Sequence, residues 1–138
     1  EKKYRRLAEK LPNPIVMSFY EPARLLEILH MADLYVHTSD AEIEAMSCME
    51  AFACGLVPVI ADSPRSATPQ FALDERSLFP AGDSVALASR IDWWIDHPAQ
   101  LAKWGGTYAK HTKTNYSVES SVRKFVAMER EAIADNRR

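Results

Sequence analysis

Short apolar runs that alternate with helical stretches constrain the fold of this chain more than any other feature of its sequence. Three such runs, each bounded by proline, glycine or polar residues, are Pro14–Phe19, Leu34–His37 and Val57–Ala61. Between them lie Ala23–Ala32, with apolar residues three or four apart, and Ser47–Cys54, a short helix that ends at Gly55. Apolar strands joined by helices predict an α/β domain, a Rossmann-like parallel sheet with helices on both faces.

The remainder of the chain is expected to be mostly helical. A brief fourth strand is predicted at Ser77–Phe79, and an apolar stripe of helical spacing follows it. Further helices are predicted over Leu101–His111, where two glycines weaken the pattern, over Val118–Ile133, and at the start over Tyr4–Leu11. A chain of 138 residues, 47% of them hydrophobic, has enough core for one domain and too little for two. We therefore expect the whole chain to form a single domain.

The loop after Leu34–His37 is the place where a ligand is expected, because parallel α/β sheets bind ligands beyond the carboxyl ends of their strands. This region is acidic: no lysine or arginine lies between Arg24 and Arg65, while seven carboxylates do. Carboxylates accept hydrogen bonds from hydroxyl groups, whereas the free amides at the start of the following helix suit a phosphate. The sequence thus favours a ligand with both hydroxyls and phosphate, whose neutralising cations come from elsewhere.

Net charge and cysteine usage exclude several other classes. Seventeen basic against 19 acidic residues, a formal net charge of -2, give no electrostatic footprint for nucleic acid. No apolar run approaches the length of a membrane span. Cys48 and Cys54 have neither a metal-ligand spacing nor enough partners for a disulfide framework. We therefore expect both thiols to pack in the core of a protein from a reducing compartment, with no metal site.

The acidic residues also have purely local interpretations. Ser47-Cys48-Met49-Glu50 matches the capping box, in which the serine and the glutamate bind each other's free backbone amides. Glu42 and Glu44 lie on a polar loop, where carboxylates are usually solvated charges. Residue spacing alone leaves these structural roles and ligand binding open.

An ordered set of residues around this loop carries a family resemblance. The run Ala32–Ser39 ends at a serine, and Glu42 and Glu50 follow with seven residues between them. Glu50-Ala51-Phe52-Ala53-Cys54-Gly55 is then followed by the strand Val57-Pro58-Val59-Ile60. This set resembles the E-x7-E motif in the donor-binding, C-terminal domain of retaining GT-B-fold glycosyltransferases, the glycosyl transferases group 1 family. The resemblance covers nearly the whole chain, including Leu25–Asp33 and Leu78–Pro98, and implies one half of a GT-B fold.

The resemblance implies a role for each matching position. Glu42 matches the glutamate that lies against the donor sugar and helps to stabilise developing positive charge, and it is the expected catalytic residue. Glu50 matches the glutamate that binds the ribose hydroxyls of the nucleotide. The backbone of four residues matches the loop that approaches the sugar and diphosphate: Ile43, Glu44, Ala45 and Met46. Three residues lie where the family places contacts to the base: Ser18, Phe19 and Tyr20.

The sequence departs from the family pattern at three places. Ile43-Glu44-Ala45 replaces the usual Gly-Phe-Gly, which restricts how closely the backbone can approach a ligand. Ser47 replaces a proline before the helix and so creates the capping box. Capping and ribose binding by Glu50 are compatible, because a carboxylate has two oxygens. Ser18 stands where glycine is common.

As a member of such a family, the protein is expected to transfer a sugar from a nucleotide-diphosphate donor to an acceptor glycan or lipid, with retention of configuration. No cofactor besides the donor substrate is expected. The resemblance also implies that three parts of the protein precede residue 1. These are an N-terminal acceptor domain, the first part of this domain, and the arginine and lysine that neutralise the diphosphate. Residues 1–138 alone are therefore expected to be inactive. A cytoplasmic location is expected, with at most peripheral membrane contact through the basic start: Lys2, Lys3, Arg5 and Arg6. The alternatives are a non-catalytic nucleotide-binding or regulatory module and a GT-B-type nucleotide-sugar epimerase.

Overall fold

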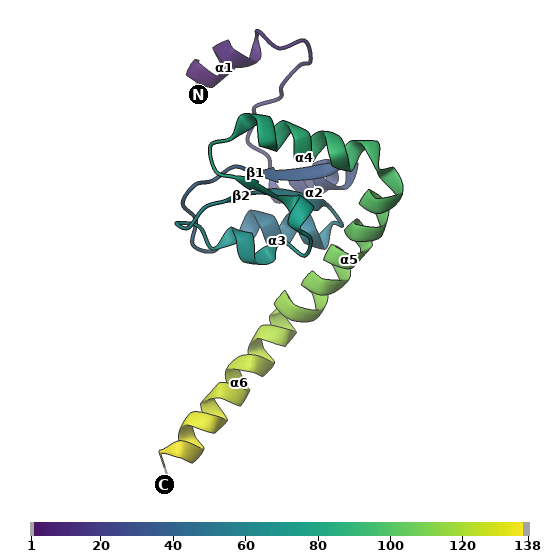
Figure 1. The fold of residues 1–138 in the computed structure, drawn as a ribbon. Helices are drawn as coiled ribbons and strands as arrows, with labels where there is room; N and C mark the ends of the chain where they lie inside the picture. The colour runs from purple at the N-terminus through teal and green to yellow at the C-terminus, as the bar shows by residue number, and fades with distance from the viewer. Residues whose placement is uncertain (1, 137–138) are drawn as a thin grey trace.

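A parallel sheet between two layers of helices forms the centre of the molecule (Figure 1). The computed structural model describes residues 2–136. Its strands β1 (Leu34–His37), β2 (Val57–Asp62) and β3 (Leu78–Pro80) pair in parallel, in the order β1-β2-β3. Helix α4 (Ser84–Asp96) lies on one face of the sheet and α3 (Met46–Ala53) on the other. The predicted parallel sheet with helices on both faces is confirmed.

The core is built around β2, the central strand. The first five residues of β2 are buried, which its apolar sequence allows because both faces of the sheet are covered. Phe52 of α3, Phe79 of β3 and Trp94 of α4 are buried in the same cluster. Both neighbouring strands pair with β2 in register, so the loops after β1 and β2 emerge at one edge of the sheet.

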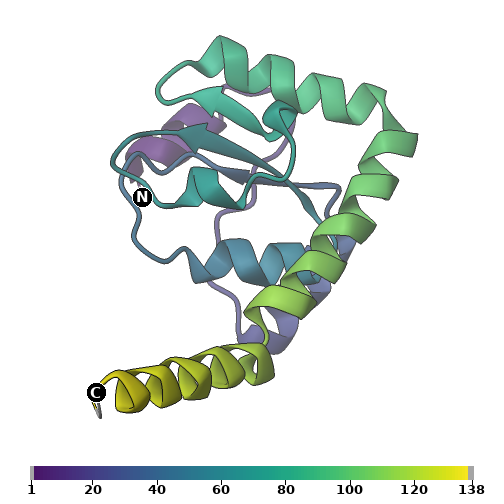
Figure 2. The same ribbon diagram turned by 60° about the horizontal axis from the view of Figure 1, so that its bottom comes forward.

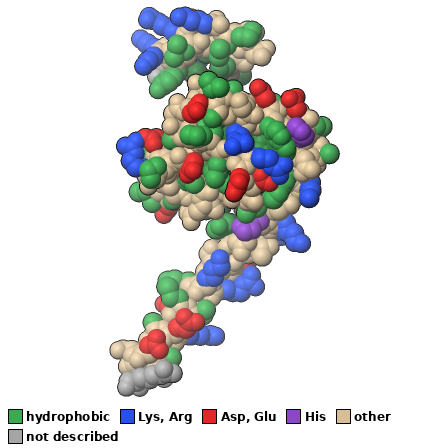
Figure 3. Space-filling view, viewed as in Figure 1, with side chains coloured by type: hydrophobic (Ala, Val, Ile, Leu, Met, Phe, Trp, Pro, Cys, Tyr) green, Lys and Arg blue, Asp and Glu red, His purple; other side chains and the backbone are tan. Residues whose placement is uncertain are grey.

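The helices confirm the predicted helical C-terminal third. Besides α3 and α4 they are α1 (Lys2–Ala8), α2 (Pro22–Met31), α5 (Pro98–Tyr116) and α6 (Val118–Asp135). Helix α6 follows α5 after a bend at Ser117, whose backbone is extended, and projects away from the sheet (Figures 1 and 2). Its apolar side chains lie at the surface together with charged ones (Figure 3). Within residues 2–136, no helix combines the length and the apolar character that a membrane span requires.

Close contact between α5 and the turn after α3 explains why Gly105, one of the two glycines that weakened the helix prediction, lies within α5. A Cβ atom at Gly105 would lie 2.4 Å from the carbonyl oxygen of Gly55, far inside the normal contact distance. Gly55 itself has a φ of 84°, in the left-handed region that glycine adopts freely at helix ends. A Cβ at the neighbouring Gly106 would meet nothing within 4 Å. Gly105 therefore lets α5 pack directly against the turn that leads from α3 into β2.

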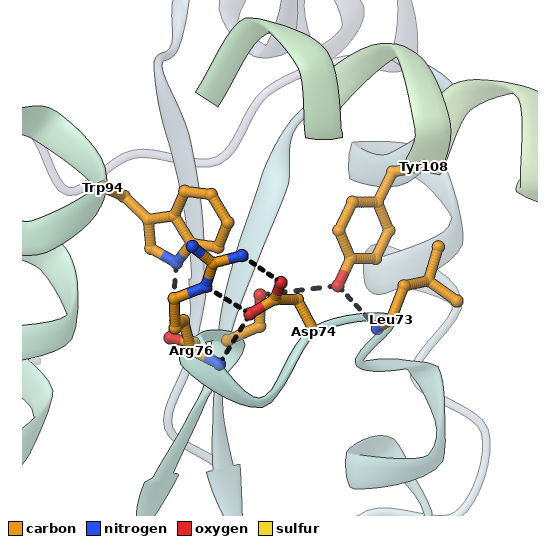
Figure 4. Close-up of polar contacts among 6 residues, drawn as sticks. Leu73, Asp74, Arg76, Trp94 and Tyr108 are labelled. Atoms are coloured by element: carbon orange, nitrogen blue, oxygen red, sulfur yellow. Dashed lines mark hydrogen bonds and ion pairs between the residues drawn. The ribbon is translucent and has the colours of Figure 1, made fainter. Parts of the chain in front are cut away.

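The segment that joins β2 to β3 is anchored to α4 and α5 by side-chain hydrogen bonds (Figure 4). The Tyr108 hydroxyl accepts from the Leu73 N–H (2.8 Å), and the Trp94 indole N–H donates to the Arg76 carbonyl (3.3 Å). The Arg76 guanidinium binds the Asp74 carboxylate and lies 4.3 Å from the centre of the Trp93 ring. The segment contains two 3-10 turns, Thr68–Phe71 and Glu75–Ser77.

The predicted strand Pro14–Phe19 is wrong. This segment has no regular secondary structure, and most of its apolar side chains are exposed, with Phe19 fully so. The sheet in the described part of the chain consists of β1, β2 and β3, and none of them pairs with this segment. An apolar run becomes a strand only when a neighbouring strand supplies the ladder hydrogen bonds and a covered face, so the sequence pattern alone was insufficient here.

Candidate functional site

Two loops lie side by side at the carboxyl edge of the sheet, one after β1 and one after β2. Glu42 in the first loop forms an isolated parallel bridge with Ser66 in the second. The Ala67 N–H donates to the Glu42 carbonyl oxygen at 2.9 Å. The backbone of Glu42 is therefore fixed by the loop that follows the next strand, at the sheet edge where α/β proteins bind ligands.

The Glu42 side chain is half-buried and held by its own loop. Its Oε1 atom accepts a hydrogen bond of 2.9 Å from the Ile43 N–H. Glu44, two residues later, is exposed, and its carboxylate has no hydrogen bond or ion pair within the described residues. Of the two neighbouring carboxylates, Glu42 is thus the one that the fold orients.

Helix α3 begins in an unusual backbone conformation. Ala45, the residue before its first turn, has a φ of 46° and is only 6% exposed. Among the described residues, Ala45 is the one non-glycine residue with a positive φ. The family pattern has glycine at this position, and alanine adopts the same left-handed conformation here at an energetic cost. Such strain persists only where the surroundings enforce it, which is common at ligand-binding sites.

The predicted capping box is wrong. The helix begins at Met46, so that Ser47 is its second residue and no side chain caps its free amides. The Ser47 hydroxyl instead lies 2.9 Å from the Tyr35 hydroxyl of β1. The Ser47 hydroxyl therefore binds the neighbouring strand and not the free amides at the start of α3. Glu50 is exposed and has no capping role.

Tyr35 and its neighbours form a polar cluster between β1 and α3. The Tyr35 hydroxyl lies 3.2 Å from His37 Nδ1 and 3.8 Å from the Cys48 sulfur, in addition to its contact with Ser47. Burial raises the pKa of Tyr35 to about 12 and that of Cys48 to about 11, and the Glu42 carboxylate adds to both shifts. Both groups are therefore neutral at physiological pH. The other ring nitrogen of His37, Nε2, is buried and has no hydrogen-bond partner in the described part of the chain.

The remaining predicted site residues lie in different surroundings. Glu50 lines a groove of about 640 Å³ between α3 and α5, together with Lys110 and Lys113. Ser18 and Phe19 line a separate cavity with Arg5 and Met17, in which neither Glu42 nor Glu50 takes part. The structure thus brings Glu42 and Ile43–Met46 together at the start of α3, and contacts of Ser18, Phe19 and Tyr20 with a base stay a prediction.

Several residues of the loop after β2 were missed by sequence reasoning. Ser63 is buried and donates to Asp40, and Arg65 forms an ion pair with the same carboxylate. Ligands bind beyond the carboxyl ends of parallel strands, and this rule applies to the loop after β2 as much as to the loop after β1. The predicted strand at Val57–Ala61 could therefore have pointed to the loop after β2. Among residues 2–136, no group of three or more His, Cys, Asp or Glu side chains is placed to hold a metal ion.

Comparison with known proteins identifies the family of this chain. Residues 1–112 match the family model described as glycosyl transferases group 1. The fold is similar to the crystal structure of the catalytic domain of cholesterol-alpha-glucosyltransferase from Helicobacter pylori. The identity is 46% and the TM-score 0.79, over 84% of this chain and 72% of that one. A search of curated proteins finds no match. The chain belongs to the glycosyl transferases group 1 family and has the architecture of a GT-B C-terminal domain.

Proposed function

We propose that this domain binds the nucleotide-sugar donor of a retaining glycosyltransferase. The observation that carries the proposal is the placement of Glu42 at the carboxyl edge of the sheet, with its backbone and carboxylate both fixed, directly before the start of α3. A fixed carboxylate stabilises the positive charge that develops on a sugar as its leaving group departs. Glu42 is the proposed catalytic residue.

The other parts of the donor are assigned by their chemistry. The amides of Glu44, Ala45 and Met46, at the positive end of α3, suit the sugar hydroxyls and the diphosphate, while the Ile43 amide holds the Glu42 carboxylate beside them. The exposed carboxylate of Glu50 suits the two ribose hydroxyls, because one ionised carboxylate accepts two O–H bonds. Ser18, Phe19 and Tyr20 are proposed to contact the base. The leaving diphosphate is stabilised electrostatically in this scheme.

Cations for the diphosphate come in part from this domain. Arg65 and Asp40 form an ion pair between the two loops, with side chains 69% and 53% exposed. Exposed ion pairs contribute little to stability, so Arg65 can exchange its carboxylate partner for a phosphate. We propose that further cations and the acceptor site belong to an N-terminal domain of the same protein, and that residues 1–138 alone bind nucleotide without transferring sugar. A cytoplasmic enzyme, with at most peripheral membrane contact, fits this scheme.

The sugar and acceptor are proposed from the similar solved structure. A chain 46% identical to the catalytic domain of a cholesterol-alpha-glucosyltransferase supports glucose as the transferred sugar and a sterol-type lipid as the acceptor. Transfer from an α-linked nucleotide-glucose into an α-glucoside is transfer with retention.

The test uses the natural full-length protein, cholesterol, and UDP-glucose, GDP-glucose or ADP-glucose in separate reactions. We expect one of the donors to give a glucosylated sterol whose anomeric proton has the small H1–H2 coupling of an α-glucoside. A β-glucoside would refute retention. Nucleotide binding in calorimetry without transfer to cholesterol, glycan or water would instead identify a non-catalytic nucleotide-binding module, and release of an isomerised free sugar or nucleotide would identify an epimerase.

A further inference from the structure

Ser63 joins the two loops at the carboxyl edge of the sheet. It is the first residue after β2, and its side chain is only 3% exposed. Its hydroxyl oxygen lies 2.7 Å from the Asp40 carbonyl oxygen and 2.8 Å from Asp40 Oδ1, and it accepts a hydrogen bond of 3.2 Å from the Arg65 N–H. The single hydroxyl proton of Ser63 is thus shared between two acceptors of Asp40 in the first loop. The hydroxyl oxygen accepts from the Arg65 N–H in the second loop.

The other end of the second loop is fixed in a similar way. The Thr68 side chain is fully buried, and its hydroxyl lies 2.7 Å from that of Ser66, which also accepts from the Thr68 N–H at 3.2 Å. The Ala67 N–H between these two residues donates to the Glu42 carbonyl oxygen. The second loop is therefore held at both ends by buried hydroxyls, and Glu42 is attached beside its Thr68 end.

Asp40 and Glu42 are two residues apart, so the second loop holds the first loop at two neighbouring points. Ser63 fixes Asp40, and Ala67 fixes Glu42. Without Ser63, the Asp40 carbonyl loses its hydroxyl partner, and the Asp40 carboxylate is held only by the exposed Arg65. The strand-side attachment of the loop that carries Glu42 would then be lost, while the attachment through Ala67 would remain.

We propose that Ser63 is a positioning residue for Glu42: its buried hydroxyl ties the loop after β1 to the loop after β2 and so fixes the Glu42 carboxylate against the donor sugar. This inference rests on the proposed role of Glu42 as the catalytic carboxylate. Catalytic groups have to be held to within a fraction of an ångström, and a misplacement of about 1 Å can lower the rate about 100-fold.

The test is a double-mutant cycle on the natural full-length protein, with cholesterol and each of UDP-glucose, GDP-glucose and ADP-glucose as donor. Ser63→Ala is expected to lower kcat about 10-fold or more with a smaller change in KM, since misplacing a reacting group costs on the order of 10- to 100-fold. In a Glu42→Gln background, the same Ser63→Ala change is expected to alter kcat less than about 2-fold, because there is no carboxylate left to position.

Ser77→Ala is the matched control, because Ser77 is equally buried and its hydroxyl contacts Tyr108 of α5 and not the loop that carries Glu42. It should lower the melting temperature about as much as Ser63→Ala and leave kcat unchanged. Asp40→Ala, at an exposed position, removes one of the two acceptors of Ser63 and covers the case in which Ser63→Ala does not fold. It should lower kcat in the wild-type background and not in the Glu42→Gln background.

Two outcomes overturn the inference. One is a kcat loss from Ser63→Ala, or from Asp40→Ala if the first variant does not fold, that is equally large with and without Glu42. The other is a Ser63→Ala variant whose kcat is unchanged like that of Ser77→Ala. The proposed function fails in a different way: Glu42→Gln alone would then keep normal turnover.

Discussion

Ala45 offers the sharpest test of the backbone geometry at the candidate site. Its φ of 46° lies in the left-handed region, although its side chain is 6% exposed and therefore packed. Replacing it with glycine removes the conformational cost and one buried methyl group. The matched control is Ala51→Gly, because Ala51 is fully buried too and lies within α3 in ordinary helical conformation.

The expected free energies of unfolding follow from these two environments. At Ala45, relief of the left-handed backbone gains about 1–2 kcal/mol. The lost methyl burial costs about 0.8 kcal/mol, and the greater freedom of glycine in the unfolded chain costs about 0.4–1 kcal/mol. These terms nearly cancel, so we expect Ala45→Gly to change stability by less than about 1 kcal/mol. At Ala51, loss of the methyl group and of helix propensity add up to about 2 kcal/mol of destabilisation.

Urea unfolding followed by circular dichroism measures both variants. We expect the midpoint of Ala45→Gly to stay near that of the wild type and that of Ala51→Gly to fall clearly, with equal slopes. If the two glycine variants lose the same stability, Ala45 has no left-handed strain to relieve, and the account of the α3 start is wrong.

Three further predictions concern packing, the nucleotide and acid stability. Gly105→Ala should destabilise the fold by about 1–3 kcal/mol because its Cβ has no space, whereas Gly106→Ala should stabilise α5 by up to about 1 kcal/mol; equal effects in thermal unfolding would contradict the close helix contact. Wild-type protein should bind UDP more tightly than 2′-deoxy-UDP in calorimetry, and Glu50→Gln should lose most of this difference; a preserved difference would remove Glu50 from the ribose site. Arg76 lowers the pKa of Asp74 below its ordinary value of 3.8, so this pair stabilises the fold above about pH 4 and loses its effect as the pH falls further. Arg76→Leu should reduce this acid sensitivity of the urea unfolding midpoint, measured down to about pH 2. An unchanged pH profile of the midpoint would contradict a stabilising role of the pair.

The sheet could be predicted from sequence wherever a strand has a pairing partner. Val57–Ala61 is apolar at every position and is indeed the buried central strand. Pro14–Phe19 has a similar pattern and forms no strand, because a local pattern reports the tendency to be buried and not the presence of a partner. The sequence pattern and the fold agree on β1, β2 and β3 and disagree where pairing is missing.

Only those parts of the candidate site that depend on neighbouring residues in the sequence could be predicted. Glu42 and the start of α3 follow from the motif and from the strand before it. The capping box at Ser47 was wrong because Tyr35, twelve residues earlier in the chain, binds the serine hydroxyl. The strand before Ser63 pointed to its loop, but the contact of Ser63 with Asp40 could not be predicted, because Asp40 lies 23 residues away and the two meet only once β1 and β2 are paired. Rules based on residue spacing fail at this site where a side chain forms a hydrogen bond with a residue distant in sequence.

The central claim is that Glu42 is the carboxylate that acts on the donor sugar. It is tested most directly by kcat of the natural full-length protein with nucleotide-glucose and cholesterol, for Glu42→Gln, Glu44→Gln and the distant control Glu75→Gln. The account predicts that Glu42→Gln loses about 100-fold or more in kcat, the usual scale for removing one electrostatic contact to a transition state, while Glu75→Gln keeps normal turnover. Normal turnover by Glu42→Gln, with the loss found in Glu44→Gln instead, would contradict it.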